Sequence, residues 1–332
     1  MNKEKRSFAL LLWILFLCML LCAFLGLRFG SAELSMGQVI RGLLRNDPDA
    51  IETKVVWVIR LPHVIGCILC GMALSISGVL LQTATNNPLA GPNIIGVNAG
   101  AGFAVVLLMC LFPMQYRLIP LAAFIGAFLC TILIVTAANK AGGARVTLVL
   151  SGVAVSTLLN AGISFLKLLY PDTSIAYNYF SAGGIDGVTF SQMLVPAVMI
   201  FITALLSMLL ANRFNLLCLG DSIVHCLGLR ARVLRSIALL LASASAAAAV
   251  SFAGLLGFVG LMVPHIARRF IKGSDLRKLL PVSAMLGAML VLLADLFGRT
   301  AFAPSQIPAG IITALIGVPF FFLLLFQRRY RL

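Results

Sequence analysis

The sequence predicts an all-α polytopic membrane protein, with about ten transmembrane helices and with both termini in the cytoplasm. Of its 332 residues, 61% are hydrophobic and only 11% are charged, a composition foreign to soluble domains of this size. The apolar residues form long runs rich in Leu, Ala and Gly and do not alternate with polar residues. This pattern favours helices over a membrane β-barrel. We expect one transmembrane domain, 1–332.

The first apolar run follows the basic sequence MNKEKRS and covers 20 residues, 8–27, without a charge. A helix of that length measures about 30 Å, enough to cross the hydrocarbon core. A cleaved signal peptide is the alternative, but its apolar core would be about 7–15 residues long and would end at a small-residue cleavage site. The longer run favours a retained helix with its basic end inside.

The segment 30–59 is expected to form an outer loop that contains a short amphipathic helix. Ser35 and Gln38 have the spacing of a capping box, the pairing that starts many helices. Apolar residues then recur at helical spacing through 36–44. We therefore expect this helix to lie on the outer surface of the membrane that the chain spans.

Nine further apolar runs predict the remaining spans, which are separated by proline, glycine and charged residues. Pro62 suits the start of the second span, since proline at the first turn of a helix loses no hydrogen bond. Two prolines and a glycine within 86–93 end that span. The nine runs cover approximately 60–83, 94–112, 118–138, 146–169, 192–211, 234–253, 255–266, 279–297 and 307–326.

The charges agree with this topology. The segments expected to be cytoplasmic hold 17 of the 25 Lys and Arg residues, whereas seven of the ten acidic residues fall outside. The net charge of +15 is therefore explained by the positive-inside rule, and nucleic acid is not an expected partner.

No motif for catalysis or nucleotide binding is present. The chain has no GxxxxGK[ST], HExxH or GxSxG sequence, and its three histidines are scattered. Cys67 and Cys70 form a CxxC, but within an apolar run, where small packing residues are expected. We expect no metal site, no cofactor bound by this chain, and no enzymatic activity.

Two polar features lie within the predicted spans. Asp295 is either a functional intramembrane acid or the partner of Arg299, one helical turn away. Small and polar residues repeat every four positions along the fifth span, which places them on one face: Gly152, Ser156, Asn160 and Ser164. That face either packs closely on another helix or lines a wet pathway. Gly310 belongs to a similar small-residue face in the last span.

The stretch 250–278 changes from apolar to strongly basic at Pro264. It has no nucleophile–base pair, so docking to a soluble partner suits it better than catalysis. Gly273 and Asp275 make a turn before a new helix start.

Several long motifs identify the chain as similar to a known family. They are RLP at 60–62, SGVLLQTATNNPLAGPNIIGVNAGAG at 77–102, LSGVA at 150–154, LGDSIVHCLGL at 219–229, GLLGFVGLMVPHIAR at 254–268, LLADLFGR at 292–299 and IPAGIITALIGVPFFFLLL at 307–325. With these motifs the chain resembles, over nearly its whole length, the permease subunits of type II bacterial ABC importers for iron–siderophores, haem and vitamin B12.

The resemblance implies partners and site residues. It implies a multi-pass permease of the bacterial cytoplasmic membrane that pairs with a second permease subunit, identical or a close paralogue. It also implies two cytoplasmic ATPases, which bind ATP and Mg²⁺, and an extracytoplasmic binding protein. The segment 264–278 would form the coupling helices that contact the ATPase, with Pro264, His265, Arg268, Arg269, Gly273 and Asp275.

Three further groups of residues gain roles from the resemblance. Gly152, Ser156, Asn160 and Ser164 would line the pathway opposite Gly310 and Thr313, and Asn87 and Leu89 would narrow its cytoplasmic exit. Arg60, His63 and Arg299 would receive the binding protein. Here the chain departs from the family's frequent RLPR motif, because His63 replaces the second arginine. The site is therefore either weaker or pH-sensitive.

The resemblance favours an iron(III)–siderophore as cargo, with haem or cobalamin as alternatives in the same kind of system. A self-sufficient secondary transporter or channel is the alternative from another class. It would need intramembrane acids for ion coupling, which are scarce in this sequence.

Overall fold

A computed structural model describes residues 3–30, 34–44, 47, 50–142, 144–301, 303 and 305–329. Parts of the predicted outer loop, at 31–33, 45–46 and 48–49, lie outside the described residues. All regular structure in the described residues is helical. The elements are α1 (Lys3–Arg28), α2 (Met36–Leu44), α3 (Ile51–Lys54), η1 (Val55–Arg60), α4 (Leu61–Thr85), η2 (Pro92–Ile95), α5 (Val97–Leu111), η3 (Tyr116–Leu118), α6 (Ile119–Lys140), α7 (Arg145–Leu169), α8 (Thr173–Ala182), α9 (Phe190–Leu209), α10 (Ala211–Leu217), α11 (Asp221–Cys226), α12 (Ala231–Ala253), α13 (Val259–Ile271), α14 (Leu276–Thr300) and α15 (Ala309–Arg329).

Seven helical stretches in the described residues are long and apolar enough to cross a membrane. They are Arg6–Arg28, Ile51–Thr85, Tyr116–Lys140, Arg145–Leu169, Phe190–Leu209, Ala231–Ala253 and Leu276–Thr300. The apolar helix α5 and the apolar part of α15 are shorter. The predicted eighth span corresponds to α13, whose 13 residues reach only about 20 Å. The structure thus confirms an all-α protein with several membrane-length helices. Fewer than ten of the described helices are long enough to span a membrane.

The amphipathic helix predicted in the outer loop is present as α2. Its capping box forms as expected, because the Ser35 N–H donates to Gln38 Oε1 at 2.8 Å and the Gln38 N–H faces Ser35 Oγ at 3.4 Å. The next helix begins earlier than the sequence predicted, at Ile51 and not at Arg60, and continues to Thr85. The π-helical turn η1 makes this possible. There the Leu61 N–H donates to the Val56 carbonyl, five residues back, in the register change that accommodates Pro62.

Three short helices were not predicted. α8 lies between the predicted spans 146–169 and 192–211, and α10 and α11 lie between the predicted spans 192–211 and 234–253, apart from the first residue of α10. Polar composition indicates correctly that these segments are not spans, but it does not distinguish a short surface helix from a loop.

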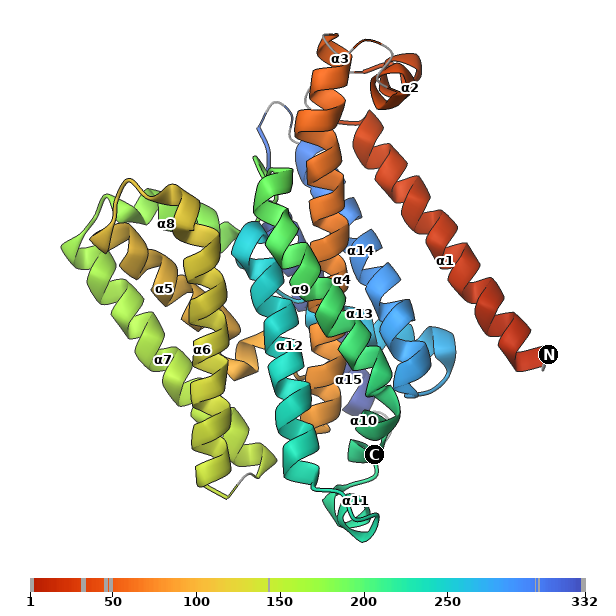
Figure 1. Ribbon diagram of the computed structural model, residues 1–332, viewed down its shortest axis with the longest axis vertical. Coiled ribbons are helices and arrows are strands. Elements are labelled where there is room, and N and C mark those ends of the chain that lie inside the picture. Colours follow the sequence, from red (N-terminus) through yellow and green to blue (C-terminus); the bar gives the residue numbers. More distant parts are fainter. Residues whose placement is uncertain are drawn as a thin grey trace.

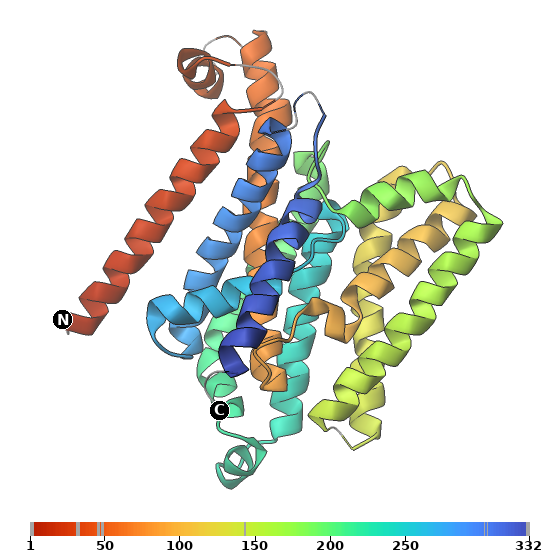
Figure 2. The same cartoon turned by 180° about the vertical axis from the view of Figure 1, so that it is seen from behind.

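Helix α4 lies at the centre of the molecule and packs on α12, α13 and α14. Helix α1 lies at one edge against α14, whereas α5, α6, α7 and α8 form a group on the opposite side, next to α12 (Figures 1 and 2). The two ends of the chain lie in the half of the molecule that is lower in Figure 1.

The contacts of α4 bring backbone against backbone. A Cβ atom on Gly71 would lie 2.1 Å from the Gly287 carbonyl oxygen, and one on Gly78 would lie 1.8 Å from the Gly260 carbonyl oxygen. Small residues allow such approaches between membrane helices, where dispersion contacts replace the hydrophobic effect. Glycine is therefore required where α4 meets α14 and α13.

Candidate functional site

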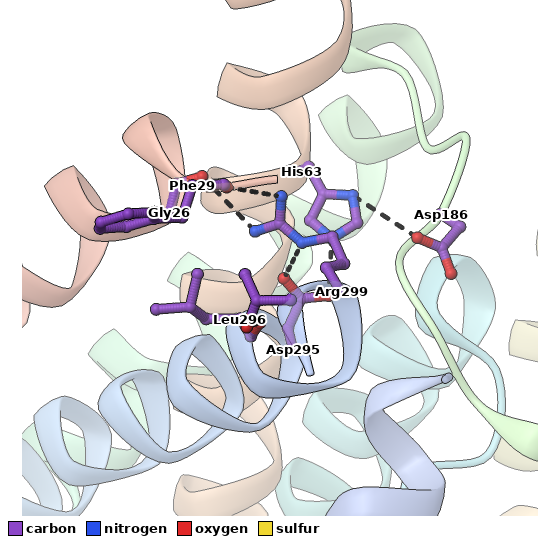
Figure 3. Close-up of polar contacts among 8 residues, drawn as sticks. Gly26, Phe29, His63, Asp186, Asp295, Leu296 and Arg299 are labelled. Atoms are coloured by element: carbon purple, nitrogen blue, oxygen red, sulfur yellow. Dashed lines mark hydrogen bonds and ion pairs between the residues drawn. The ribbon is translucent and has the colours of Figure 1, made fainter. Parts of the chain in front are cut away.

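A polar cluster lies where α1, α4 and α14 meet. We call His63, Asp186, Asp295, Arg299 and Arg60 the outer polar cluster, after the side of the membrane on which the sequence predicts them. Asp295 accepts hydrogen bonds from His63 Nε2 at 2.7 Å and from Arg299 Nε at 2.9 Å (Figure 3). Asp186, in the loop before α9, has its Oδ1 4.0 Å from His63 Nδ1. Of the two alternatives for Asp295, the structure shows the pairing with Arg299, and a histidine 232 residues away in the sequence joins it.

Both arginines of the outer polar cluster bind the end of α1. Arg299 donates to the Gly26 and Phe29 carbonyls at 3.4 Å each, and Arg60 donates to the Leu27 carbonyl and, at 2.7 Å, to the Arg28 carbonyl. The last carbonyls of a helix have no partner within the helix, so the guanidinium groups satisfy them and favour its negative end. These bonds attach α1 to α4 and α14.

Burial limits how the cluster could meet another protein. Arg60, His63 and Arg299 are only 4%, 6% and 7% exposed. All three line a cavity of about 270 Å³, together with Asp186 and Gln306. The family resemblance implied that these residues receive the binding protein. In this structure they face a small recess, so a partner's side chain would have to enter that recess to reach them.

Burial raises the pKa of the Asp186 carboxyl, and the nearby Asp295 acts in the same direction, whereas His63 opposes the shift. Cys67 adds a third ligand type, because its Sγ lies within 4.8 Å of the ligand atoms of His63 and Asp295. Both Asp295 oxygens already accept hydrogen bonds, so the arrangement is better described as a hydrogen-bonded cluster than as a metal centre.

At the other end of α4, the basic residues of α13 differ in their environment. Arg268 is half-buried and donates to Gln82 Oε1, while Gln82 Nε2 donates to the Leu261 carbonyl at 3.2 Å. These two hydrogen bonds attach both ends of α13 to α4. Arg269 is exposed. Of these two predicted coupling residues, Arg269 is the more exposed, and it lines a recess of about 270 Å³ with Phe320 of α15.

Of the other predicted coupling residues, Pro264 and His265 lie within α13, whereas Gly273 and Asp275 lie between α13 and α14. Pro264 is buried within α13, and the His265 ring meets Phe320 of α15 edge-on at 6.1 Å. Gly273 is exposed in the turn. Asp275 caps α14, since its Oδ1 accepts from the Arg277 N–H at 3.1 Å and from Asn215 Nδ2 at 2.8 Å. The Arg277 side chain lowers the pKa of Asp275 by hydrogen bonding. The predicted helix start at Asp275 is confirmed.

The predicted exit residues lie beside this region. The Leu89 N–H donates to Asn87 Oδ1 at 3.0 Å, which closes a tight turn. Leu89 lines a cavity of about 130 Å³ that Leu261 of α13 also lines. In α11, Asp221 binds Arg235 at 2.6 Å and Arg145 at 3.2 Å, which joins α11, α12 and α7. The hydrogen bond from Arg235 is the main reason that the pKa of Asp221 is lowered.

The stripe on α7 divides into two parts. A Cβ on Gly152 would lie 1.9 Å from the Ile94 carbonyl oxygen, so this end packs on η2. The Ser156 hydroxyl is buried without a hydrogen-bond partner among the described residues. Asn160 and Ser164 are exposed. Packing therefore explains the first residue, whereas the last two face outward.

The structure does not bring the α7 stripe together with the residues of α15. Gly310 lines a cavity of about 720 Å³ with residues that include Asn98, Ser181 and Leu315, none of them from α7. Thr313 is fully buried and donates to the Gly310 carbonyl at 3.0 Å. Helices α7 and α15 lie apart (Figure 2), so one pathway lined by both would require a second subunit.

Comparison with known proteins decides the family. The profile of the FecCD transport family matches residues 17–327. The chain belongs to the FecCD transport family. One relative is the Fe(3+)-citrate import system permease protein YfmE of Bacillus subtilis (strain 168), 34% identical over 99% of this chain and 98% of that protein. Another is the hemin transport system permease protein HmuU of Yersinia pestis, 36% identical over 82% of this chain and 84% of that protein.

A solved structure supports the same assignment. A metal-chelate type ABC transporter in an inward-facing conformation superposes with a TM-score of 0.84, at 27% identity, over 96% of this chain and 99% of that one. This FecCD-family chain is accordingly a multi-pass protein of the cell membrane and a transporter subunit, not an enzyme. The family resemblance read from the motifs is confirmed.

Proposed function

We propose that this chain is the membrane-spanning permease subunit of an ATP-driven importer for a metal chelate, with an iron(III)–siderophore as its cargo. The match to the FecCD family across residues 17–327 carries the proposal. Relatives are named for Fe(3+)-citrate, hemin and iron(3+)-hydroxamate import, which favours iron in chelated form. Haem is the second candidate, because the hemin permease is as similar as the siderophore permeases. Cobalamin is the third.

The proposed assembly contains two permease subunits, two cytoplasmic ATPases and an extracytoplasmic binding protein. The chain has no phosphate-binding loop, so ATP and Mg²⁺ bind the ATPases and this chain carries no cofactor. In the proposed topology, the seven membrane-length helices, the shorter apolar helices α5 and α15, and the short helix α13 are the ten spans, and both termini are cytoplasmic. A second subunit supplies the opposite wall of a pathway to which Ser156, Asn160, Ser164, Gly310 and Thr313 contribute.

Alternating access follows from the same assembly. ATP binding moves the ATPases, α13 and the turn at 272–275 receive that motion, and the exit near Asn87 and Leu89 opens or closes. The binding protein docks over the recess of the outer polar cluster, where Arg60, His63 and Arg299 attract its acidic side chains.

The deciding experiment is reconstitution in liposomes, with and without the ATPase and the binding protein. We expect uptake of a labelled ferric siderophore only with all three components and ATP. Hemin and cobalamin, tested in parallel, identify the cargo. Uptake by this chain alone, driven by an ion gradient, would contradict the proposal and favour a secondary transporter.

Arg269→Glu is expected to weaken ATPase binding at least about tenfold, because a reversed charge at the exposed end of α13 meets the partner directly. Arg268→Gln should leave the ATPase bound but reduce coupled transport, since it removes the bond to Gln82 within this chain. Co-purification with the ATPase and ATP-driven uptake are the two measurements. Arg213→Glu, an exposed arginine on α10, is the charge-matched control. Wild-type co-purification of Arg269→Glu would show that α13 does not dock through this residue.

A further inference from the structure

A groove opens between α6 and α9. Each of these helices packs on α12, but they make little contact with each other, so they form the two walls and α12 forms the floor (Figure 1). The groove has a volume of about 750 Å³, within the range of small-molecule sites. It lies outside the outer polar cluster, the α15 cavity and the α13 region, and the proposed function does not use it.

The groove is polar at one end and apolar along the rest of its length. Arg117 lies at the mouth, and Thr189 and Ser191, whose hydroxyls are 3.0 Å apart, lie at the same end, just before and at the start of α9. Gln192 of α9 lines the groove beside them, the remaining wall residues are apolar, and Ser251 of α12 lies at the floor. The apolar wall residues are Pro120, Leu121 and Phe124 of α6 and Val195, Pro196 and Met199 of α9.

The length of the groove along α9 matches the thickness of one leaflet of a bilayer. From Thr189 to Met199 the groove follows α9 for about 15 Å, at the helical rise per residue. Half of the hydrocarbon core is also about 15 Å thick. Both walls belong to helices that are long and apolar enough to cross the membrane, so the groove faces lipid from the headgroup level inward.

The charges identify the kind of ligand. Arg117 is the only charged residue that lines the groove, and it is exposed. Within the described part of the chain, it makes no ion pair. A guanidinium group binds a phosphate oxygen pair with fixed geometry, and a cation at the membrane surface attracts anionic lipid. A hydrophilic chelate would leave its polar atoms against the apolar walls unpaired.

We propose that this groove binds an anionic phospholipid, with its phosphate at Arg117 and one acyl chain between α6 and α9. The hydroxyls of Thr189 and Ser191 lie where the glycerol and ester oxygens need hydrogen-bond partners. The acyl chain lies against Leu121, Phe124 and Val195. A bound lipid would fill the space between α6 and α9. It would thereby stabilise the packing of the α5–α8 group on the central helices.

Native mass spectrometry of the purified full chain tests the proposal, with phosphatidylglycerol and phosphatidylcholine as the two probes. We expect Arg117→Gln to lower phosphatidylglycerol binding about fivefold, the effect of about 1 kcal/mol for one cation at an anionic surface, and to abolish the preference over phosphatidylcholine. Val195→Trp should fill the groove and lower binding of both lipids. Arg41→Gln, which removes an exposed cation on α2, keeps the net charge matched and should behave as wild type.

Photocrosslinking identifies the occupant in the membrane. A benzophenone amino acid in place of Val195 should capture phospholipid, whereas the same group in place of Leu158, an exposed residue of α7, should capture less. A cross-link to a protein band in place of lipid would overturn the proposal, because a partner helix would then occupy the groove. Equal lipid binding by wild type, Arg117→Gln and Val195→Trp would also overturn it. Neither measurement depends on transport, so the lipid site and the importer function are tested separately.

Discussion

Replacing Asp295 with alanine is expected to lower the free energy of unfolding by about 3–5 kcal/mol, the usual cost of removing one partner from a buried ion pair. Asp295 is 4% exposed and is the acceptor for both His63 and Arg299. Its removal leaves the Arg299 guanidinium buried without a counter-charge and releases it from the geometry that holds the carbonyls of Gly26 and Phe29. Helix α1 should then detach from α14.

The measurement is thermal unfolding of the purified chain in detergent, with an expected fall in Tm of about 5–10 °C. The control is Asp172→Ala, because Asp172 is exposed and its side chain makes no cap hydrogen bond, and it should change Tm little. The double variant Asp295→Ala/Arg299→Ala should be less destabilised than the sum of the single variants, since it removes the unpaired charge. Additive losses would show that the two side chains do not act as a pair.

The outer polar cluster also shows what the sequence could and could not predict. The spacing of Asp295 and Arg299, one helical turn apart, was sufficient to predict their contact, because helix geometry alone brings such residues together. The bond between His63 and Asp295 joins positions 232 residues apart, and no local pattern encodes it. The burial of Arg60 could not be predicted for the same reason, because its hydrogen-bond acceptors are carbonyls of another helix, α1.

The opposite end of α4, where it meets α13, follows the same rule. The cap at Asp275 was predicted because it depends on a turn and a helix start that are adjacent in the sequence. The hydrogen bond between Arg268 and Gln82 was not predicted, because it depends on how α13 crosses α4. The family motifs marked both segments without saying which side chains face a partner. The difference between Arg268 and Arg269, neighbours in sequence, came only from the packed structure.

Among the described glycines, Gly78 is expected to be the one where substitution by alanine is most damaging. The added Cβ would lie 1.8 Å from the Gly260 carbonyl oxygen, and a backbone oxygen cannot move aside as a flexible side chain can. Helices α4 and α13 would have to separate, at a cost of about 3 kcal/mol or more. Gly260→Ala should cost less, because its Cβ would lie 2.8 Å from the Leu74 carbonyl oxygen. Gly37→Ala, with nothing within 4 Å of its Cβ, should cost nothing in helix α2.

The three variants add the same methyl group, so their order of stability tests the backbone contact directly. Equal Tm values for Gly78→Ala and Gly37→Ala would contradict the close approach of α4 and α13. Function provides a second test. Gly78 lies one turn before Gln82, which holds Arg268 and the Leu261 carbonyl, so separation of the helices should break both bonds. If α13 transmits motion to α4 as proposed, Gly78→Ala protein that still folds is expected to support ATP hydrolysis by its partner ATPase without chelate uptake.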